Sequence, residues 1–221
     1  MHSHLVPGVD DGSDSLETSL TLIKGLIGLG YKKIITTPHI RPEYFPNTPE
    51  TILHGFEQLK KAVTAAGLEV ELECAAEYFV DYEFKEVMGK GDLLTFNGNH
   101  LLMEVSTFSP PPNLYDTIFQ MRIKGYRPII AHPERYVYYK VDEFEKLKDF
   151  GCMLQVNTMS LAGHYGKQVK DLAMKLVKAD LVDLLGTDMH NPRHLGVLEK
   201  ITTDGNIMNL IADKRFKNST F

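Results

Sequence analysis

Histidine and acidic side chains recur in this chain at one kind of position, close to the ends of short apolar or β-branched runs. His2 and His4 alternate at the start, so on an extended segment both imidazoles face the same side. Imidazole and carboxylate ligands together suit first-row divalent metals such as Mn, Fe, Co or Zn. The candidates are too many for one four-coordinate ion, so we expect two or three ions bridged by carboxylate. They are His2, His4, His39, Glu77, Glu104, His132, Asp188, His190 and one aspartate of the Asp10-Asp11 pair.

Each of these residues taken alone has a simpler interpretation. A single histidine after a strand is more often a hydrogen-bonded loop residue than a ligand, and His-x-His occurs by chance. Asp10-Asp11-Gly12 by itself signals only a turn. The coincidence of ligand-type residues at successive strands favours the metal site. We expect no role there for His54, His100 or His164, which lie in a helix, a polar turn and a Gly-flanked loop.

Two arginines follow candidate ligands at the same spacing. Arg135 lies three residues after His132, and Arg193 lies three residues after His190. A guanidinium group binds phosphate oxygens through two parallel hydrogen bonds, which lysine does not do. An arginine beside a metal cluster would be repelled by its positive charge, and a phosphate dianion between the two would explain their proximity. The alternative for either residue is a surface ion pair.

The elements that must position these residues alternate between strand and helix. Val70, Leu72 and Cys74 alternate with glutamates, as expected of a half-exposed strand. Such alternation predicts a parallel sheet with crossover helices, and about seven units without a GxGxxG or Walker sequence favour a closed barrel. Barrels of this kind place their active sites at the carboxyl ends of the strands. We expect strands at the His2–His4 segment, 33–37, 69–76, 101–105, 128–131, 153–156 and 181–185, and helices at 14–29, 49–66, 81–89, 113–124, 142–150, 166–179 and 192–203.

Composition narrows the class of protein. The chain has 221 residues and a formal net charge of −5, which argues against a nucleic-acid or anionic-membrane binder. Cys74 and Cys152 have no CxxC spacing and are expected to be cytoplasmic thiols. No apolar run is long enough to span a membrane. We expect a single domain over residues 1–221, with the sequence beginning inside the first strand.

Seven motifs in order resemble the polymerase and histidinol phosphatase (PHP) superfamily. Within it they are most similar to the metal-dependent protein-tyrosine phosphatases of capsule and exopolysaccharide operons, the CpsB/CapC/YwqE-like proteins. The resemblance covers nearly the whole chain, except for the residues that usually precede the His-x-His pair. The motifs are His2-Ser3-His4-Leu5-Val6-Pro7-Gly8-Val9-Asp10-Asp11-Gly12, Thr37-Pro38-His39, Ala76-Glu77, Met103-Glu104-Val105, Ala131-His132-Pro133-Glu134-Arg135-Tyr136, Gln155-Val156-Asn157 and Thr187-Asp188-Met189-His190-Asn191.

The resemblance implies an α/β fold, a distorted (β/α)7 TIM-like barrel called the PHP fold, with three divalent metal ions, usually Mn2+. Arg135 and Arg193 match the family's phosphate-binding arginines. Asp11 is favoured over Asp10 by its place before the glycine. The implied ligand sets are His2, His4, Glu77 and Asp188 for one ion; Glu77, Glu104 and His132 for the second; and Asp11, His39 and His190 for the third.

The implied activity is phosphomonoester hydrolysis. A hydroxide bridging the metals would attack phosphorus in line, and the implied substrate is a phosphotyrosine protein, a bacterial tyrosine kinase of capsule synthesis. The leaving phenolate, with a pKa of about 10, needs little proton assistance, and no general acid is assigned. Tyr44 and Phe45 are candidates to flank the substrate ring, although surface packing is the simpler role. No arginine follows either cysteine at Cys-x5-Arg spacing, which excludes a cysteine-nucleophile phosphatase.

Three other functions compete with this one. A small-molecule phosphatase of the same superfamily, acting on a substrate such as histidinol phosphate, is the nearest. A non-catalytic, metal-stabilised regulatory module would be expected to have lost ligands. An amidohydrolase also begins with His-x-His, but the strand carrying Glu77 has no lysine for a carbamylated bridge.

Overall fold

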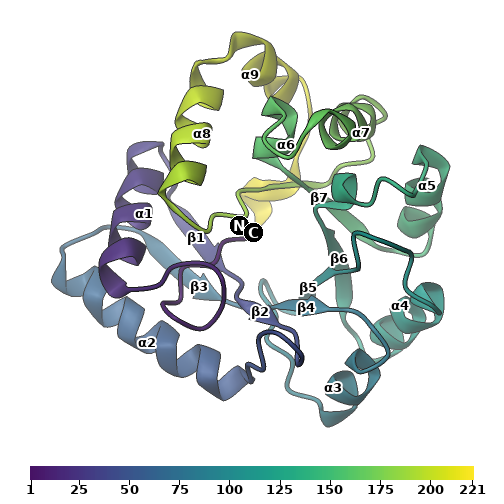
Figure 1. The fold of residues 1–221 in the computed structure, drawn as a ribbon, viewed down its shortest axis with the longest axis horizontal. Coiled ribbons are helices and arrows are strands. Elements are labelled where there is room, and N and C mark those ends of the chain that lie inside the picture. The colour runs from purple at the N-terminus through teal and green to yellow at the C-terminus, as the bar shows by residue number, and fades with distance from the viewer.

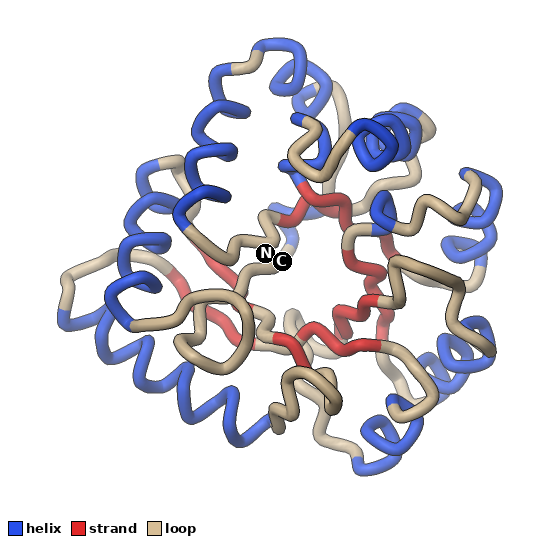
Figure 2. Tube along the Cα trace, viewed as in Figure 1, coloured by secondary structure: helices blue, strands red, loops and turns tan.

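A ring of strands surrounded by helices forms the core of the protein. The computed structural model describes residues 1–221. Figures 1 and 2 show the strands around a central axis and the helices outside them. The strands are β1 (Lys33–Thr36), β2 (His39–Ile40), β3 (Glu71–Cys74), β4 (Glu77–Phe79), β5 (His100–Glu104), β6 (Arg127–Ala131), β7 (Met153–Asn157) and β8 (Leu184–Gly186).

The helices occupy the connections between strands, as expected of crossovers in a parallel sheet. Pro49 begins α2 directly after the N-cap residue Thr48, at a position where its missing N–H costs nothing. The α-helices are α1 (Leu16–Gly28), α2 (Pro49–Ala65), α3 (Phe84–Lys90), α4 (Leu114–Ile123), α5 (Val141–Asp149), α6 (Thr158–Ala162), α7 (Lys167–Lys178), α8 (Pro192–Thr203) and α9 (Gly205–Ala212). Two 3-10 turns, η1 (Pro133–Arg135) and η2 (Lys217–Thr220), complete the structure. None of the helices combines the length and the apolar composition needed to cross a bilayer.

The strands pair in parallel throughout. Six of them form one sheet in the order β2-β4-β5-β6-β7-β8, and β1 pairs with β3. Each of these two strands continues into the next after two residues, with 37–38 between β1 and β2 and 75–76 between β3 and β4. The pairing keeps its register across these gaps, where the Glu77 amide donates to the Pro38 carbonyl at 3.0 Å. The predicted strand 33–37 is found as β1 and the predicted strand 69–76 as β3, and β2 and β4 continue beyond the predicted ends.

The N-terminal segment closes the ring. On one side the Asp188 amide donates to the His2 carbonyl at 2.9 Å, and the His4 amide donates to the Met189 carbonyl at 2.8 Å. On the other side the Thr37 amide donates to the Ser3 carbonyl at 2.7 Å. Seven lengths of chain thus surround the axis, in agreement with the α/β barrel prediction.

The expected first strand differs from the prediction. Residues 2–4 form only an isolated parallel bridge between Ser3 and Met189. The reason is the backbone of His2, which has a φ of 63° and so departs from the extended conformation that a regular strand requires.

Alternation along the strands separates the inside of the ring from the outside. On β5, Leu101 and Met103 pack in the large core between strands and helices, whereas Leu102 belongs to a second, smaller apolar cluster. Because successive side chains point to opposite faces, this smaller cluster lies inside the ring. It consists of Ile35, Ala75, Phe96, Leu102, Ile129, Ala131 and Leu184.

Candidate metal centre

Two of the acidic candidates occupy inward-facing positions of the strands, next to the apolar cluster inside the ring. Glu104 comes two residues after Leu102, and Glu77 comes two residues after Ala75, so both carboxylates point inward above the apolar cluster. Both side chains are nearly or fully buried. The alternation that places apolar side chains inside the ring therefore also places these acidic side chains there, toward the carboxyl ends of the strands.

Three groups of ligand atoms gather at this end, and within each group all atoms lie within 4.8 Å of one another. Glu77, His39 and His4 each belong to two of the groups. The groups are His2, His4, Glu77 and Asp188; His39, Glu77 and Glu104; and His4, Asp11, His39 and His190.

The innermost group is buried. The Nε2 atoms of His2 and His4 lie 3.3 Å apart. The same two nitrogens approach Glu77 Oε2 at 3.1 and 3.4 Å and Asp188 Oδ1 at 3.2 and 3.4 Å. Two imidazole nitrogens and two carboxylate oxygens thus lie close enough together that they would hold one metal ion.

His132 completes the second group. Its Nε2 lies 3.0 Å from Glu77 Oε1 and 3.7 Å from Glu104 Oε2. His39 Nδ1 lies 3.3 Å from Glu77 Oε2 and 3.4 Å from Glu104 Oε1. Glu77 therefore has one oxygen facing each side, as a carboxylate that bridges two cations would.

The third group lies nearer to solvent and distinguishes the two neighbouring aspartates. Asp11 Oδ1 lies 3.6 Å from His39 Nε2 and 3.4 Å from His190 Nε2. Asp10 instead accepts hydrogen bonds from the amides of His39 and Gly12 and lies 2.7 Å from His4 Nδ1. Asp10 orients the surrounding residues, while Asp11 faces the other ligands.

Polar groups also contact the atoms of other candidate ligands that face away from the cluster. The Gln155 amide lies 3.1 Å from His2 Nδ1, and the Asn157 amide donates to Asp188 Oδ2 at 2.7 Å. His190 Nδ1 lies 2.8 Å from the Asp188 carbonyl. With the outer nitrogens and oxygens held in this way, the inner atoms are directed into the cluster.

Three of the candidate ligands have left-handed backbone conformations. The φ angles are 63° for His2, 34° for His132 and 49° for Asp188. Such a conformation costs about 1–3 kcal/mol at a residue that is not glycine, and it concentrates at functional sites. At His132 it turns the side chain inward, whereas continued alternation after Ala131 would point it outward.

The electrostatics of the cluster favour a bound cation. Burial, followed by the charge of Glu77, raises the pKa of Glu104 to about 8. Burial lowers the pKa of His39 to about 4, with the neighbouring His4 adding to the effect, and His39 Nδ1 is buried without a hydrogen-bond partner. A neutral imidazole nitrogen beside close carboxylates is a suitable ligand for a divalent metal, whose charge would relieve the carboxylate repulsion. The residues present therefore fit the metals that the sequence predicts.

A cavity of about 380 Å³ opens above the cluster. Arg135 lines it, with Nη1 3.8 Å from Asp188 Oδ2 and its guanidinium 5.5 Å from the centre of the Tyr165 ring. The other lining residues are Asp11, His39, Arg41, Phe45, Glu104, His132, Tyr165, Asp188, His190, Asn191 and His194.

The second predicted arginine occupies a different place. Arg193 is exposed on the first turn of α8 and is not among the residues that line the cavity. Arg41, which the sequence analysis did not single out, lines the cavity instead, and its guanidinium lies about 4 Å from the ring centres of Tyr44 and Phe79. Its position two residues after His39 was the only sequence signal for it.

The remaining aromatic and histidine candidates differ in where the structure places them. Phe45 stacks on the His39 ring, with centroids 5.3 Å apart, while Tyr44 is exposed over Arg41. His54 is exposed on α2 and His100 begins β5 at the opposite end of the ring. His164 is exposed, with its ring centroid 5.2 Å from that of His194.

Comparison with known proteins places these observations in a family. The family model described as capsular polysaccharide synthesis, CpsB/CapC, matches residues 1–196. The tyrosine-protein phosphatase YwqE of Bacillus subtilis (strain 168) is 28% identical over 194 residues, covering 86% of this chain and 76% of that protein. The tyrosine-protein phosphatase CpsB of Streptococcus pneumoniae is 29% identical over 199 residues, covering 86% of this chain and 82% of that protein.

The fold is similar to a solved structure as well. A crystal structure described as that of YwqE from Bacillus subtilis and CpsB from Streptococcus pneumoniae, metal-dependent tyrosine phosphatases, superposes with a TM-score of 0.81 at 26% identity. The match covers 97% of this chain and 94% of the other.

Proposed function

Because this chain belongs to the CpsB/CapC family of capsular polysaccharide synthesis proteins, we propose that it is a metal-dependent protein-tyrosine phosphatase. The observation that carries the proposal is the convergence of three groups of imidazole and carboxylate ligands below a cavity that Arg135 lines. The relatives named tyrosine-protein phosphatases support it.

Three divalent ions, with Mn2+ as the first choice, would occupy the three groups of ligands. We assign His2, His4, Glu77 and Asp188 to one ion, Glu77, Glu104 and His132 to the second, and Asp11, His39 and His190 to the third. When bound, the ions would supply positive charge for the phosphate oxygens and make a water acidic enough to attack phosphorus near neutral pH.

The protein's own groups bind and orient the phosphate. Arg135 is held beside Asp188 and over the Tyr165 ring, so its planar donors are arranged before the substrate arrives. It would bind two phosphate oxygens and stabilise the charge spread over them in the transition state. Arg193, exposed on the first turn of α8, would reach the same phosphate only from outside the cavity lining.

The substrate is a phosphotyrosine side chain on a protein, and we propose a bacterial tyrosine kinase of capsule synthesis as that protein. A tyrosine phenolate, with a pKa of about 10, leaves without a strong acid. The net charge of −5 argues against a polynucleotide substrate. We also propose a cytoplasmic location, which the free cysteines Cys74 and Cys152 support.

Metal removal and substrate comparison test this function. Protein stripped with a chelator is expected to retain less than about 1% of the turnover it recovers with Mn2+, because attack on phosphorus needs the Lewis acid. We expect the kcat/KM for a phosphotyrosyl peptide to exceed that for histidinol phosphate at least about tenfold. Faster hydrolysis of histidinol phosphate would overturn the tyrosine-phosphatase assignment, and undiminished turnover without metal would overturn the mechanism.

Asn157→Ala tests how the ligands are oriented. The amide of Asn157 is the buried donor to Asp188 Oδ2, so its removal is expected to weaken Mn2+ binding about 10–100-fold. Titration calorimetry of stripped protein would measure the loss. Asn209→Ala, an exposed change on α9, is the control and should bind Mn2+ as the natural protein does. Equal affinity in both variants would contradict the orienting role.

A further inference from the structure

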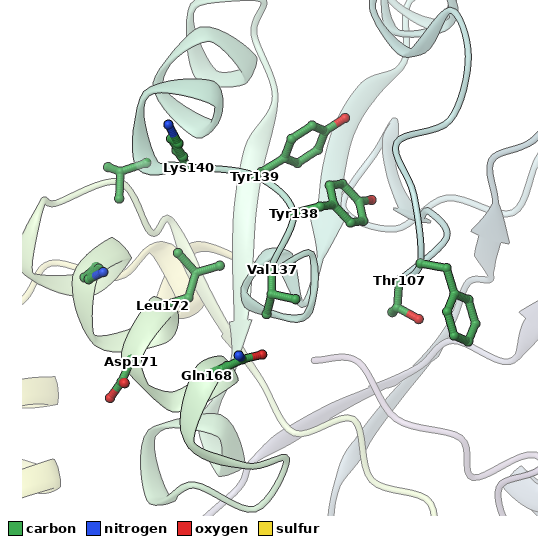
Figure 3. A pocket seen from close by; sticks show the side chains of 11 residues that line it. Thr107, Val137, Tyr138, Tyr139, Lys140, Gln168, Asp171 and Leu172 are labelled. Atoms are coloured by element: carbon green, nitrogen blue, oxygen red, sulfur yellow. The ribbon is translucent and has the colours of Figure 1, made fainter.

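A second and larger cavity lies beside the candidate metal centre. It has a volume of about 660 Å³, and its walls include Phe108, Val137, Tyr138, Lys140, Leu172 and Lys175. Figure 3 shows Val137 and Tyr138 between Thr107 on one side and Leu172 and Gln168 of α7 on the other. None of the candidate ligands lines this cavity, so it is not part of the candidate metal centre.

The two cavities are joined by the segments that form them. Glu104, Arg135 and Tyr165 line the cavity above the metal centre. Phe108, Val137 and Gln168 line the second one and follow those residues by four, two and three positions. A chain of two to four residues spans at most about 7–14 Å, so a peptide of similar length would reach from one cavity to the other.

Six of the eleven residues that line the second cavity are hydrophobic, and a hydrogen bond between two loops holds its opening. Phe108 is 94% exposed and Val137 is 45% exposed, so both leave apolar surface at the cavity that a ligand could cover. The Tyr138 hydroxyl donates to the Ser106 carbonyl at 2.6 Å. This hydrogen bond joins the loop after β5 to the loop after β6 and so fixes the shape of the opening.

The charge at the edge of the cavity is positive. Lys140 and Lys175 are both exposed and line the cavity, and neither forms an ion pair. The one acidic side chain of the lining, Asp171, is paired with Lys167. An acidic group on a ligand would therefore meet two cations with no competing partner.

On the basis of the proposed phosphatase function, we propose that this cavity binds the polypeptide that flanks the phosphotyrosine of the substrate. An apolar side chain two to four residues from the phosphotyrosine would pack against Phe108 and Val137. An acidic side chain in the same stretch would pair with Lys140 or Lys175. The cavity thus selects among phosphotyrosine sites by their neighbouring sequence, while the phosphate itself is bound at the metal centre.

Two phosphotyrosyl peptides and p-nitrophenyl phosphate test this selectivity on the Mn2+-loaded full chain. One peptide carries Leu and Glu two to four positions to either side of the phosphotyrosine, and the other carries Gly and Ser there. We expect the natural protein to prefer the Leu/Glu peptide about tenfold in kcat/KM, and Phe108→Ala or the pair Lys140→Glu and Lys175→Glu to remove the preference. Hydrolysis of p-nitrophenyl phosphate, which does not reach the cavity, should change less than about twofold.

Matched variants elsewhere on the surface control for general effects. Phe119→Ala removes an exposed phenylalanine of α4, and Lys61→Glu reverses an exposed charge of α2; both should keep the preference. Absence of a preference in the natural protein, or its persistence in the cavity variants, would overturn the inference while leaving the phosphatase function intact. A change in sedimentation caused by Phe108→Ala would identify the cavity as an interface between copies and would also overturn it. If the Mn2+-loaded protein hydrolysed none of the three compounds, the proposed function itself would be overturned.

Discussion

Glu77→Gln is expected to lower phosphatase turnover at least about 1000-fold and to reduce the Mn2+ content of the protein. The glutamine has the same size, but its neutral amide has only one oxygen to offer, whereas Glu77 directs an oxygen to each side of the cluster. A loss of this size corresponds to about 4 kcal/mol of transition-state stabilisation. Steady-state kinetics with p-nitrophenyl phosphate and elemental analysis of the same samples would measure both effects.

The neighbouring strand offers a matched control for this change. Glu71→Gln alters an exposed carboxylate of β3 that pairs only with Lys33, and it is expected to leave both turnover and metal content unchanged. If a folded Glu77→Gln protein kept full metal content and turnover within about tenfold of the natural protein, the bridging role of Glu77 would be wrong.

Arg135→Ala is expected to lower kcat/KM about 100–1000-fold while the Mn2+ content stays the same. Arg135 is not a metal ligand, and its guanidinium lies at the cavity where the phosphate would bind. Removing one donor that stabilises transition-state charge costs this much in other enzymes. Arg135→Lys should recover little of the loss, since an ammonium group lacks the paired, planar donors of arginine.

Arg127→Ala is the corresponding control, because Arg127 begins the same strand, β6, that ends just before His132. It is expected to retain full activity. Loss of metal in Arg135→Ala would instead show that this arginine supports the cluster through Asp188, its neighbour at 3.8 Å. Undiminished kcat/KM in Arg135→Ala would remove it from phosphate binding.

The elements of this fold were predictable where local pattern decides them. The expected helix 49–66 is found as Pro49–Ala65, and the expected helix 192–203 is found as Pro192–Thr203. In both, a capping residue and a proline define the beginning. β2 and β4 lie beyond the predicted ends of strands 33–37 and 69–76, and their short sequences carried no such signal.

The convergence of His4, Glu77 and Asp188 followed from residue type and strand position alone, because carboxyl ends of parallel strands meet at one edge. Other contacts did not follow. Gln155 and Asn157 appeared in the family motif without a role, and the structure places both behind metal-ligand candidates. Arg41 lines the cavity above the cluster, whereas Arg193 is exposed and is not among its lining residues.

Residue types and their alternation thus determined the chemistry of this protein and the face on which it lies. Only the closed ring decided which groups touch: Asp11 rather than Asp10 facing His39 and His190, and His132 turned inward by its backbone. The physical reason is that alternation is a local property, set by the geometry of one strand. Distances between residues far apart in sequence depend instead on how the N-terminal segment joins β1 to β8 and on the path of each loop.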